Sequence, residues 1–329
     1  MIRLSRTRMV VGLAVCIVLC AVAILVAPFV GKPWIDPWRA LGEDGVDARI
    51  LALRLPRAVA AAIAGAGLAT AGTTLQALVR NPLADPYTLG IAGGASLGAV
   101  LTIQVGLAVI APLAAFIGAA AAAALVYRFA RVGRSLPPAT LLLAGVTVSL
   151  MCSAFIMVIQ AFADWTESYK MARWFMGGLD ATTFDKVLPS ACAMPVGLGL
   201  MFAVARDLNA LSANEDTAAS VGVSVLRATS LAYGGAAIAI AAAVALAGPV
   251  GFVGLLVPHV LRALLGPDHR LLLPASAFAG GAFVVACDVL ARTLVYPRAL
   301  PVGVITALMG GPFFLILLVR SRRGTGVWG

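Results

Sequence analysis

Charged residues are scarce in this sequence. Only 12% of its 329 residues are Asp, Glu, Lys or Arg, against roughly 25% in soluble domains. Apolar residues make up 61% and the mean hydropathy is +1.01, which excludes an ordinary soluble protein and predicts a membrane protein. Lys and Arg outnumber Asp and Glu by 24 to 14. These charges lie in short clusters between apolar runs, which favours orientation in a membrane over nucleic-acid binding.

Residue patterns for catalysis, metal binding and nucleotide binding are missing as well. The two histidines, His259 and His269, belong to no catalytic pattern, and the only Gly-Lys pair, Gly31-Lys32, is followed by Pro33, so the ATP-binding P-loop is absent. The sequence therefore predicts a chain that is not an enzyme and has no cofactor, metal or nucleotide of its own. The five cysteines lie in apolar runs without zinc or disulfide spacing: Cys16, Cys20, Cys152, Cys192 and Cys287.

Long apolar runs predict an all-α polytopic membrane protein with about ten transmembrane helices in a single domain, residues 1–329. The first run follows Arg3, Arg6 and Arg8 and is longer than the apolar part of a signal peptide, so we expect an uncleaved helix. The run 255–265 is too short to cross a bilayer alone. The expected helices span 9–30, 56–79, 87–107, 110–130, 140–162, 187–205, 227–247, 255–265, 271–293 and 302–319.

An even number of spans places both termini on the same side of the membrane. Of the 24 Lys and Arg residues, fourteen fall on the side of the termini and ten on the other. This excess predicts cytoplasmic N- and C-termini. The other side is still unusually basic, and an acidic external partner would account for that.

The stretch from Arg54 to Gly98 holds the most distinctive motifs. It opens with Arg-Leu-Pro-Arg and continues without charge to Val79. It then breaks at Asn81-Pro82-Leu83-Ala84-Asp85-Pro86, through which no helix can continue. Beyond the break, Gly90, Gly94 and Gly98 would line one helical face and allow close packing, within the chain or between two copies.

These strings, with GGAS from Gly93, WFMGGLD from Trp174 and GFVGLLVPH from Gly251, resemble permeases of the FecCD type. The resemblance implies a type II ABC importer permease fold in the bacterial inner membrane. It also implies three kinds of partner: a second copy of the chain, two ATP-binding cassette subunits that bind ATP and Mg, and a periplasmic substrate-binding protein. The residues of the structural motif are Gln76, Asn81, Pro82, Asp85, Pro86, Gly90, Gly94 and Gly98.

Three arginines are candidates for docking the binding protein. Arg54 and Arg57 are three residues apart at a helix start and share a face, a pattern that also fits arginines that snorkel to the membrane surface. The resemblance implies that both, together with Arg292, dock glutamates of the binding protein. Asp288 is the one carboxylate well inside an expected span. Its place four residues before Arg292 predicts a local ion pair rather than a proton relay.

The polar segment 206–226 contains a candidate coupling helix. Ser212-Ala213-Asn214-Glu215 has capping-box spacing, which predicts a short helix that starts at Ser212 and ends at Gly222. By itself this is an ordinary surface helix, but the spacing from Glu215 to Gly222 resembles the family's coupling helix, which sits in a groove of the ATPase. The expected contact residues are Ser212, Asn214, Glu215, Asp216, Ala218, Val221 and Gly222.

The resemblance also implies a translocation path between two copies of the chain, lined by the helix after residue 139 and by the Gly-rich segment before residue 255. The turn before that helix forms the family's inner gate. Here it reads Pro137-Pro138-Ala139, which departs from the small hydroxylated residues usual in the family. The expected path and gate residues are Pro137, Pro138, Ala139, Leu141, Leu142, Gly145, Ser149, Gly248, Pro249, Gly251 and Gly254.

The predicted function is that of a permease subunit that moves haem or a ferric siderophore into the cytoplasm by alternating access at a homodimer interface. Cobalamin is the alternative cargo for the same fold. An ion-coupled secondary transporter is the alternative from another class, but it predicts several ionisable residues deep in the spans, where only Asp288 is found. An intramembrane enzyme would need a facing nucleophile and base, and no such pair is visible.

Overall fold

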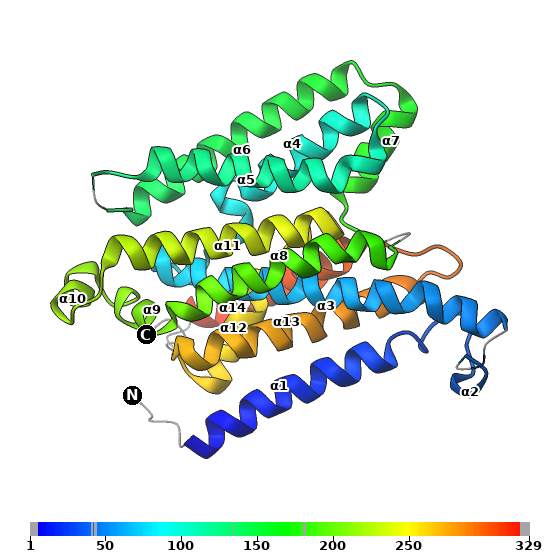
Figure 1. The fold of residues 1–329 in the computed structure, drawn as a ribbon, viewed down its shortest axis with the longest axis horizontal. Coiled ribbons are helices and arrows are strands. Elements are labelled where there is room, and N and C mark those ends of the chain that lie inside the picture. Colours follow the sequence, from blue (N-terminus) through cyan, green and yellow to red (C-terminus); the bar gives the residue numbers. More distant parts are fainter. Residues whose placement is uncertain (1–5, 41, 43–44, 134, 180–181, 323–329) are drawn as a thin grey trace.

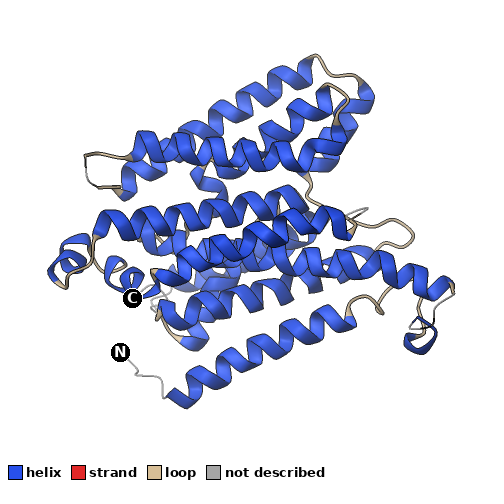
Figure 2. Cartoon of the chain, in the orientation of Figure 1, coloured by secondary structure: helices blue, strands red, loops and turns tan. Residues whose placement is uncertain are grey.

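The computed structural model describes residues 6–40, 42, 45–133, 135–179 and 182–322, and these fold into helices and loops (Figures 1 and 2). Arg3, one of the residues expected to flank the first helix, lies outside them. The elements are α1 Arg6–Val26, α2 Pro37–Ala40, α3 Val46–Val79, η1 Pro86–Leu89, α4 Ile91–Gln104, η2 Ala108–Ile110, α5 Ala111–Ala130, α6 Pro138–Ala161, α7 Trp165–Phe175, α8 Phe184–Ala203, α9 Ala205–Leu211, α10 Glu215–Ser220, α11 Val225–Ala247, α12 Val253–Leu265, α13 His269–Thr293 and α14 Val302–Arg322.

Within the described ranges, seven helices are long and apolar enough to cross a membrane: α1, α3, α5, α6, α8, α11 and α13. Three shorter apolar helices, Ile91–Gln104, Val253–Leu265 and Val302–Ile316, occupy three further places where the sequence predicts spans. The chain is therefore an all-helical, multi-pass membrane protein.

Helix α3 forms the centre of the bundle. It packs against α13, α11, α12 and α8, while α1 lies at the edge against α13 (Figure 1). Small residues let its backbone approach its neighbours: a Cβ on Gly65 would collide with the carbonyl of Gly280, and one on Gly72 with that of Gly254. The Thr73 hydroxyl lies 2.8 Å from that of Ser276 on α13. This close packing is typical of membrane helices, where burial in lipid gives no hydrophobic driving force for association.

The glycines after the break act inside one chain. A Cβ on Gly94 would collide with Gly118 and one on Gly98 with Ala114, both on α5. Gly90 caps the start of α4 with a φ of +77° and faces α6. The contacts that these glycines permit are therefore those of α4 with α5 and α6.

Helix α3 begins at Val46 rather than near Pro56, so part of the expected polar loop 31–53 is helical. Pro56 lies inside the helix, where its ring removes the hydrogen bond to the carbonyl of Ala52. Ala52 is exposed, so solvent can satisfy that carbonyl. The prediction that the helix starts at the proline was wrong because a proline is tolerated where the freed carbonyl is not buried.

Two other expected elements also differ. The span predicted for 87–107 is divided into η1 and α4, because the positive φ of Gly90 turns the chain between them. The polar segment after residue 162 contains the helix α7, which is not among the helices expected from the sequence. By contrast, α12 starts just after the expected Gly-rich break, where Phe252 takes a φ of +67°.

The packing of α8 against α11 can be tested with two adjacent glycines. Gly235→Ala is expected to destabilise the chain by about 1–3 kcal/mol, because the new Cβ would lie 2.8 Å from the carbonyl oxygen of Gly197 and 2.9 Å from the side chain of Met201. Gly234→Ala meets no atom within 4 Å and is expected to be neutral or to stabilise the helix by up to about 1 kcal/mol. Thermal unfolding in detergent compares them, and equal midpoints would contradict this packing.

Candidate functional site

The residues that the sequence analysis selected fall into three groups, which we locate by the two ends of the bundle. Figure 1 shows α10 at one end, called here the α10 end, and α7 and α2 at the other, called the α7 end. The arginine group lies at the α7 end, the coupling residues lie at the α10 end, and the path residues lie between them.

At the α7 end, Asp288 joins two of the three candidate docking arginines. Its carboxylate lies 2.7 Å from Nε of Arg57 and 3.3 Å from Nε of Arg292. The predicted pair with Arg292 is thus confirmed, and the pair with Arg57, which comes from a helix 231 residues away, was missed. The side chains are 1%, 14% and 10% exposed for Asp288, Arg57 and Arg292, so this is a largely buried ion cluster.

Backbone carbonyl groups accept hydrogen bonds from two of the arginines. Arg292 donates to the carbonyl of Ala27 at 2.6 Å. Arg54, one turn before Arg57, donates to the carbonyls of Pro28 and Pro33 at 3.2 and 3.0 Å. Arg54 and Arg292 therefore also fasten the segment after α1 to α3 and α13.

Between the two ends, two neighbouring cavities of about 400 and 510 Å³ open on the surface of the bundle. They share Tyr87, Phe175 and Pro249. The first also reaches Ser149 on α6, and the second reaches Gly251. Of the predicted path residues, the structure thus brings Ser149, Pro249 and Gly251 to one place.

The remaining predicted path and gate residues have other surroundings. Gly248 lines a different cavity, on the other side of α7. Gly254 and Gly145 pack tightly against the segment 86–89. Leu141 is buried, and Leu142 is packed against the core. Pro137 caps the start of α6, with Pro138 and Ala139 in its first turn.

Tyr87 lines both cavities but was not among the path residues expected from the sequence. The turn that carries it is built by residues 80–86: the side chain of Asn81 accepts from the N–H of Leu83 at 2.9 Å, and that of Asp85 accepts from the N–H of Tyr87 at 3.0 Å. Asp85 thereby caps η1 and directs Tyr87 to the cavities. The hydroxyl of Ser149, which lines the first of these cavities, is shielded and has no hydrogen-bond partner among the described residues.

Gln76 ties the central helix to the segment that follows the path. Its side-chain amide donates to the carbonyl of Gly254 at 3.1 Å, and its oxygen accepts from Arg262 at 2.9 Å. Both partners belong to α12. A movement of α12 is therefore transmitted to α3.

At the α10 end, the candidate coupling helix is shorter than predicted. It is capped by Asn214, whose side chain accepts from the N–H of Asp216. Ser212 instead ends α9 and donates its hydroxyl to the carbonyl of Asn209 at 2.9 Å. The predicted capping box is wrong because Ser212, its expected first residue, still belongs to the end of α9. Gly222, with a φ of +85°, follows the end of α10 as expected.

The coupling helix is fastened directly to the central helix. Arg80, the C-cap of α3, donates to the carbonyl of Leu211 at 3.1 Å and pairs with Glu215 at 2.9 Å. Ala218 is buried, whereas Val221 is 67% exposed, so the outer face of α10 and its C-terminal end remain accessible. This contact between α10 and α3 was not predicted.

A second tie joins α9 to α13. Asn209 donates to the carboxylate of Asp268 at 2.8 Å and accepts from the N–H of His269 at 2.8 Å. Hydrogen bonding from Arg270 holds the pKa of Asp268 down at about 2, so this cap stays ionised at physiological pH. His259, the other histidine, lies edge-on to Phe313 with ring centroids 6.0 Å apart.

Comparisons with known proteins identify the family. The model of the FecCD transport family matches residues 15–320. The cobalamin import system permease protein BtuC of Halobacterium salinarum is 44% identical over 274 residues, which cover 82% of this chain and 73% of that protein. The hemin transport system permease protein HmuU of Yersinia pestis is 39% identical over 295 residues, which cover 87% of each.

A solved structure has the same fold. It shows an inward-facing conformation of an ABC transporter assigned to the metal-chelate type, with a TM-score of 0.84 and 27% sequence identity, and the match covers 94% of this chain and 99% of that one.

Proposed function

This chain belongs to the FecCD transport family and is an ABC importer permease, and from that premise we propose that it carries a large metal chelate inward across the bacterial inner membrane. In this proposal the chain crosses the membrane ten times and both termini are cytoplasmic. The α10 end then faces the cytoplasm and the α7 end faces the periplasm. Two ATPase subunits act on α10, and a periplasmic binding protein docks at the α7 end.

The observation that carries this proposal is the character of the two cavities beside Tyr87. Among the described residues that line them there is no charged side chain. They contain small and apolar residues with a few hydroxyl groups, such as those of Tyr87, Ser149 and Ser153. Such a surface lets a bulky solute pass without binding it tightly, and its described residues include no Asp, Glu, His, Lys or Arg for coupling to a proton or sodium gradient.

The cavities also favour a homodimer. Both are open to the surface of the bundle, and apolar side chains of α6 and α14 beside them are exposed, among them Met157 and Leu308. A second copy that packs over this face would convert two open cavities into an enclosed path. The residues of one chain would then form half of that path.

Docking at the α7 end involves Arg54, Arg57 and Arg292. Asp288 already pairs with two of them. A glutamate of a binding protein would therefore either share these arginines with Asp288 or replace Asp288 as their partner. Charged contacts of this kind increase the association rate and set the orientation of the partner.

The cargo we propose first is haem or a ferric siderophore, and cobalamin is the second candidate. Relatives named for hemin and for cobalamin match this chain at 39% and 44% identity. Haem and cobalamin both have a metal in a broad, nearly planar ring, which suits an uncharged path with small residues.

Reconstitution tests the proposal. The chain, its ATPase and its binding protein are placed in liposomes, and uptake of labelled haem, ferric siderophore and cobalamin is measured with ATP and with a non-hydrolysable analogue. Uptake is expected only with ATP and with the binding protein. Uptake by the chain alone, driven by an ion gradient, would contradict the proposal.

Narrowing the path should block it. Ser149→Trp is expected to reduce uptake by about tenfold or more, because the indole fills the cavity that Ser149 lines. Ile117→Trp on α5, where the side chain is 58% exposed and lines neither cavity, is the control and should transport normally. Normal uptake by a folded Ser149→Trp protein would place the path elsewhere.

A further inference from the structure

A cavity of about 410 Å³ lies at the α10 end, beside the segment that follows α10. It is lined by the end of α8, by α9, by residues 221–224 and by the first turns of α11. Val221 and Gly222 are also expected contacts of the ATPase, but the other residues of this cavity have no role described above. The helices α8 and α11 pack against each other and lead to it from the middle of the bundle (Figure 1).

Two opposite charges line this cavity without pairing. Asp207 of α9 and Arg227 of α11 are both among its lining residues, and neither side chain forms an ion pair or a hydrogen bond with any described residue. Ser224, the N-cap of α11, lines it too, and its side chain makes no capping hydrogen bond. A carboxylate accepts hydrogen bonds and a guanidinium donates them. The cavity therefore suits a ligand that carries both a cation and an anion.

An exposed stripe of α11 leads away from the cavity. Arg227, Leu231, Gly234 and Ile238 are exposed or partly exposed and recur every three or four residues, so they share one face of the helix. Leu231, one turn beyond Arg227, still lines the cavity. Because α11 is apolar and long enough to cross a membrane, this α11 stripe runs from the charged end of the cavity toward the interior of the bilayer.

The α11 stripe lies between two neighbouring helices and has free space beside it. On one side of the stripe, Ser230 lies 2.8 Å from the hydroxyl of Tyr127 on α5. On the other side, Gly235 packs against Gly197 on α8. Between them, a Cβ on Gly234 would meet no atom within 4 Å. An apolar chain can therefore lie along the stripe.

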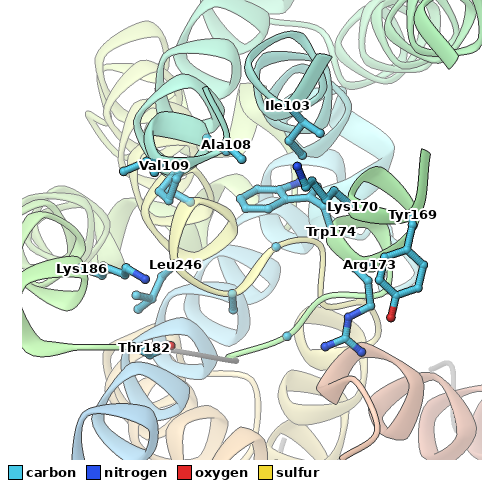
Figure 3. A pocket seen from close by; sticks show the side chains of 16 residues that line it. Ile103, Ala108, Val109, Tyr169, Lys170, Arg173, Trp174, Thr182, Lys186 and Leu246 are labelled. Carbon is cyan, nitrogen blue, oxygen red and sulfur yellow. The ribbon is translucent and has the colours of Figure 1, made fainter. Parts of the chain in front are cut away.

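The cavity on the other side of α7, which Figure 3 shows, has a different composition. The charged residues among its described lining are Lys170, Arg173 and Lys186, all cations. Arg173 and Lys186 already have interaction partners within the chain, and Ile103 lies beside Lys170 (Figure 3). Opposite charges at one end with an apolar surface beyond them are therefore a feature of the cavity beside α10 and not of this one.

We propose that the cavity beside α10 binds the headgroup of phosphatidylethanolamine from the adjoining leaflet. This lipid has a phosphate and a primary ammonium group separated by two carbon atoms. The phosphate accepts from Arg227 and Ser224, the ammonium group donates to Asp207, and an acyl chain covers Leu231 and Gly234. The quaternary ammonium group of phosphatidylcholine has no N–H to donate, and phosphatidylglycerol has no cation, so neither can satisfy Asp207.

A lipid fits the position of this cavity better than a side chain of the ATPase does. The ATPase can reach residues 221 and 222, which follow α10. Leu231 and Gly234, however, lie one and two turns beyond Arg227 inside the apolar span of α11, where lipid is the available partner. Lipid binding requires neither ATP nor the partner subunits, so its test is independent of the transport function.

Native mass spectrometry of the full chain in detergent tests the site with three lipids that have the same acyl chains. The wild type is expected to bind one phosphatidylethanolamine at least about tenfold more tightly than phosphatidylcholine or phosphatidylglycerol, the usual effect of one hydrogen bond to a charged group. Asp207→Asn is expected to abolish this preference. Arg227→Gln is expected to weaken the binding of all three lipids by about tenfold, because each has the phosphate. Phosphoethanolamine without acyl chains should bind at least about tenfold more weakly than the lipid.

Asp185→Asn and Arg206→Gln are the matched controls, since they make the same changes at exposed residues that do not line the cavity. Both should bind the lipids as the wild type does, and unfolding at the wild-type temperature shows that each variant is folded. The absence of a preference in the wild type, or an unchanged preference in folded Asp207→Asn, would overturn the proposal. Phosphoethanolamine that binds as tightly as the lipid would overturn the membrane source. If the two cavity variants weakened binding of the ATPase subunit and left lipid binding unchanged, the cavity would be an ATPase contact and the proposal would be wrong.

Discussion

Replacing Asp288 with alanine is expected to destabilise the chain by about 3–5 kcal/mol, the usual cost of removing one partner from a buried ion pair. The carboxylate is 1% exposed and lies between Arg57 and Arg292, whose side chains are 14% and 10% exposed. Without it, two shielded guanidinium groups repel each other in a region of low dielectric constant. The loss of α3–α13 contact should follow, because Arg57 and Arg292 belong to these two helices.

Thermal unfolding of the purified chain in detergent measures this effect. Asp288→Asn preserves the shape of the side chain and one acceptor oxygen. Its unfolding temperature is therefore expected to lie between those of the wild type and the alanine variant. Asp36→Ala is the matched control: its pair with Arg39 spans 3.8 Å with side chains 46% and 82% exposed, and such pairs contribute little. If the alanine variant at position 288 unfolded at the same temperature as the wild type, the arginines would need no internal counter-ion.

Local patterns in the sequence predicted most of the helices but not how they meet. Apolar runs predicted where the spans lie. Gly222 and the break at residues 80–86 predicted where two helices end, because a glycine or a proline acts on the backbone within a few residues. The start of α3 was misplaced because Pro56 is compatible both with a first turn and with a helix interior whose freed carbonyl is exposed. The four-residue spacing of Gly90, Gly94 and Gly98 predicted close packing, but only the fold shows that Gly94 and Gly98 meet α5.

The candidate site shows the same division. The ion pair between Asp288 and Arg292 follows from their spacing on one helix, whereas the shorter contact with Arg57 depends on the packing of α3 against α13. Tyr87 carries no motif of its own, and it lines the two cavities because Asp85 caps the turn that holds it. No regular spacing in the sequence predicts such contacts between residues that are far apart in the chain.

The structure makes α3 the common support of both ends of the molecule. Arg54 and Arg57, two of the candidate docking arginines, stand in its first half, and Arg80 at its last turn holds α10 through Leu211 and Glu215. Gln76, one turn before Arg80, binds α12. A displacement of α10 therefore reaches α3 and α12 by direct hydrogen bonds, in addition to the covalent links through α9 and α11.

Replacing Glu215–Ser220 with a six-residue Gly/Ser segment is expected to reduce ATP-driven uptake by about 100-fold, near the upper end of usual coupling energies between two sites. The replacement keeps the chain length but removes the helix, its cap by Asn214 and its ion pair with Arg80. The ATPase should then lose the rigid element that it pushes. The pair itself is partly exposed, with side chains 29% and 27% accessible, so its loss should cost the chain about 1 kcal/mol or less of stability.

That difference between transport and stability is what makes the test decisive. The variant should insert, unfold at nearly the wild-type temperature and keep its affinity for the binding protein, while uptake and the stimulation of ATP hydrolysis by binding protein are lost. A Gly/Ser replacement of α2, Pro37–Ala40, at the other end of the bundle, controls for the substitution and should retain ATPase stimulation. If the α10 variant still imported its cargo at the wild-type rate, force would have to enter the permease through a different contact, and the link from Arg80 to Glu215 would be only structural.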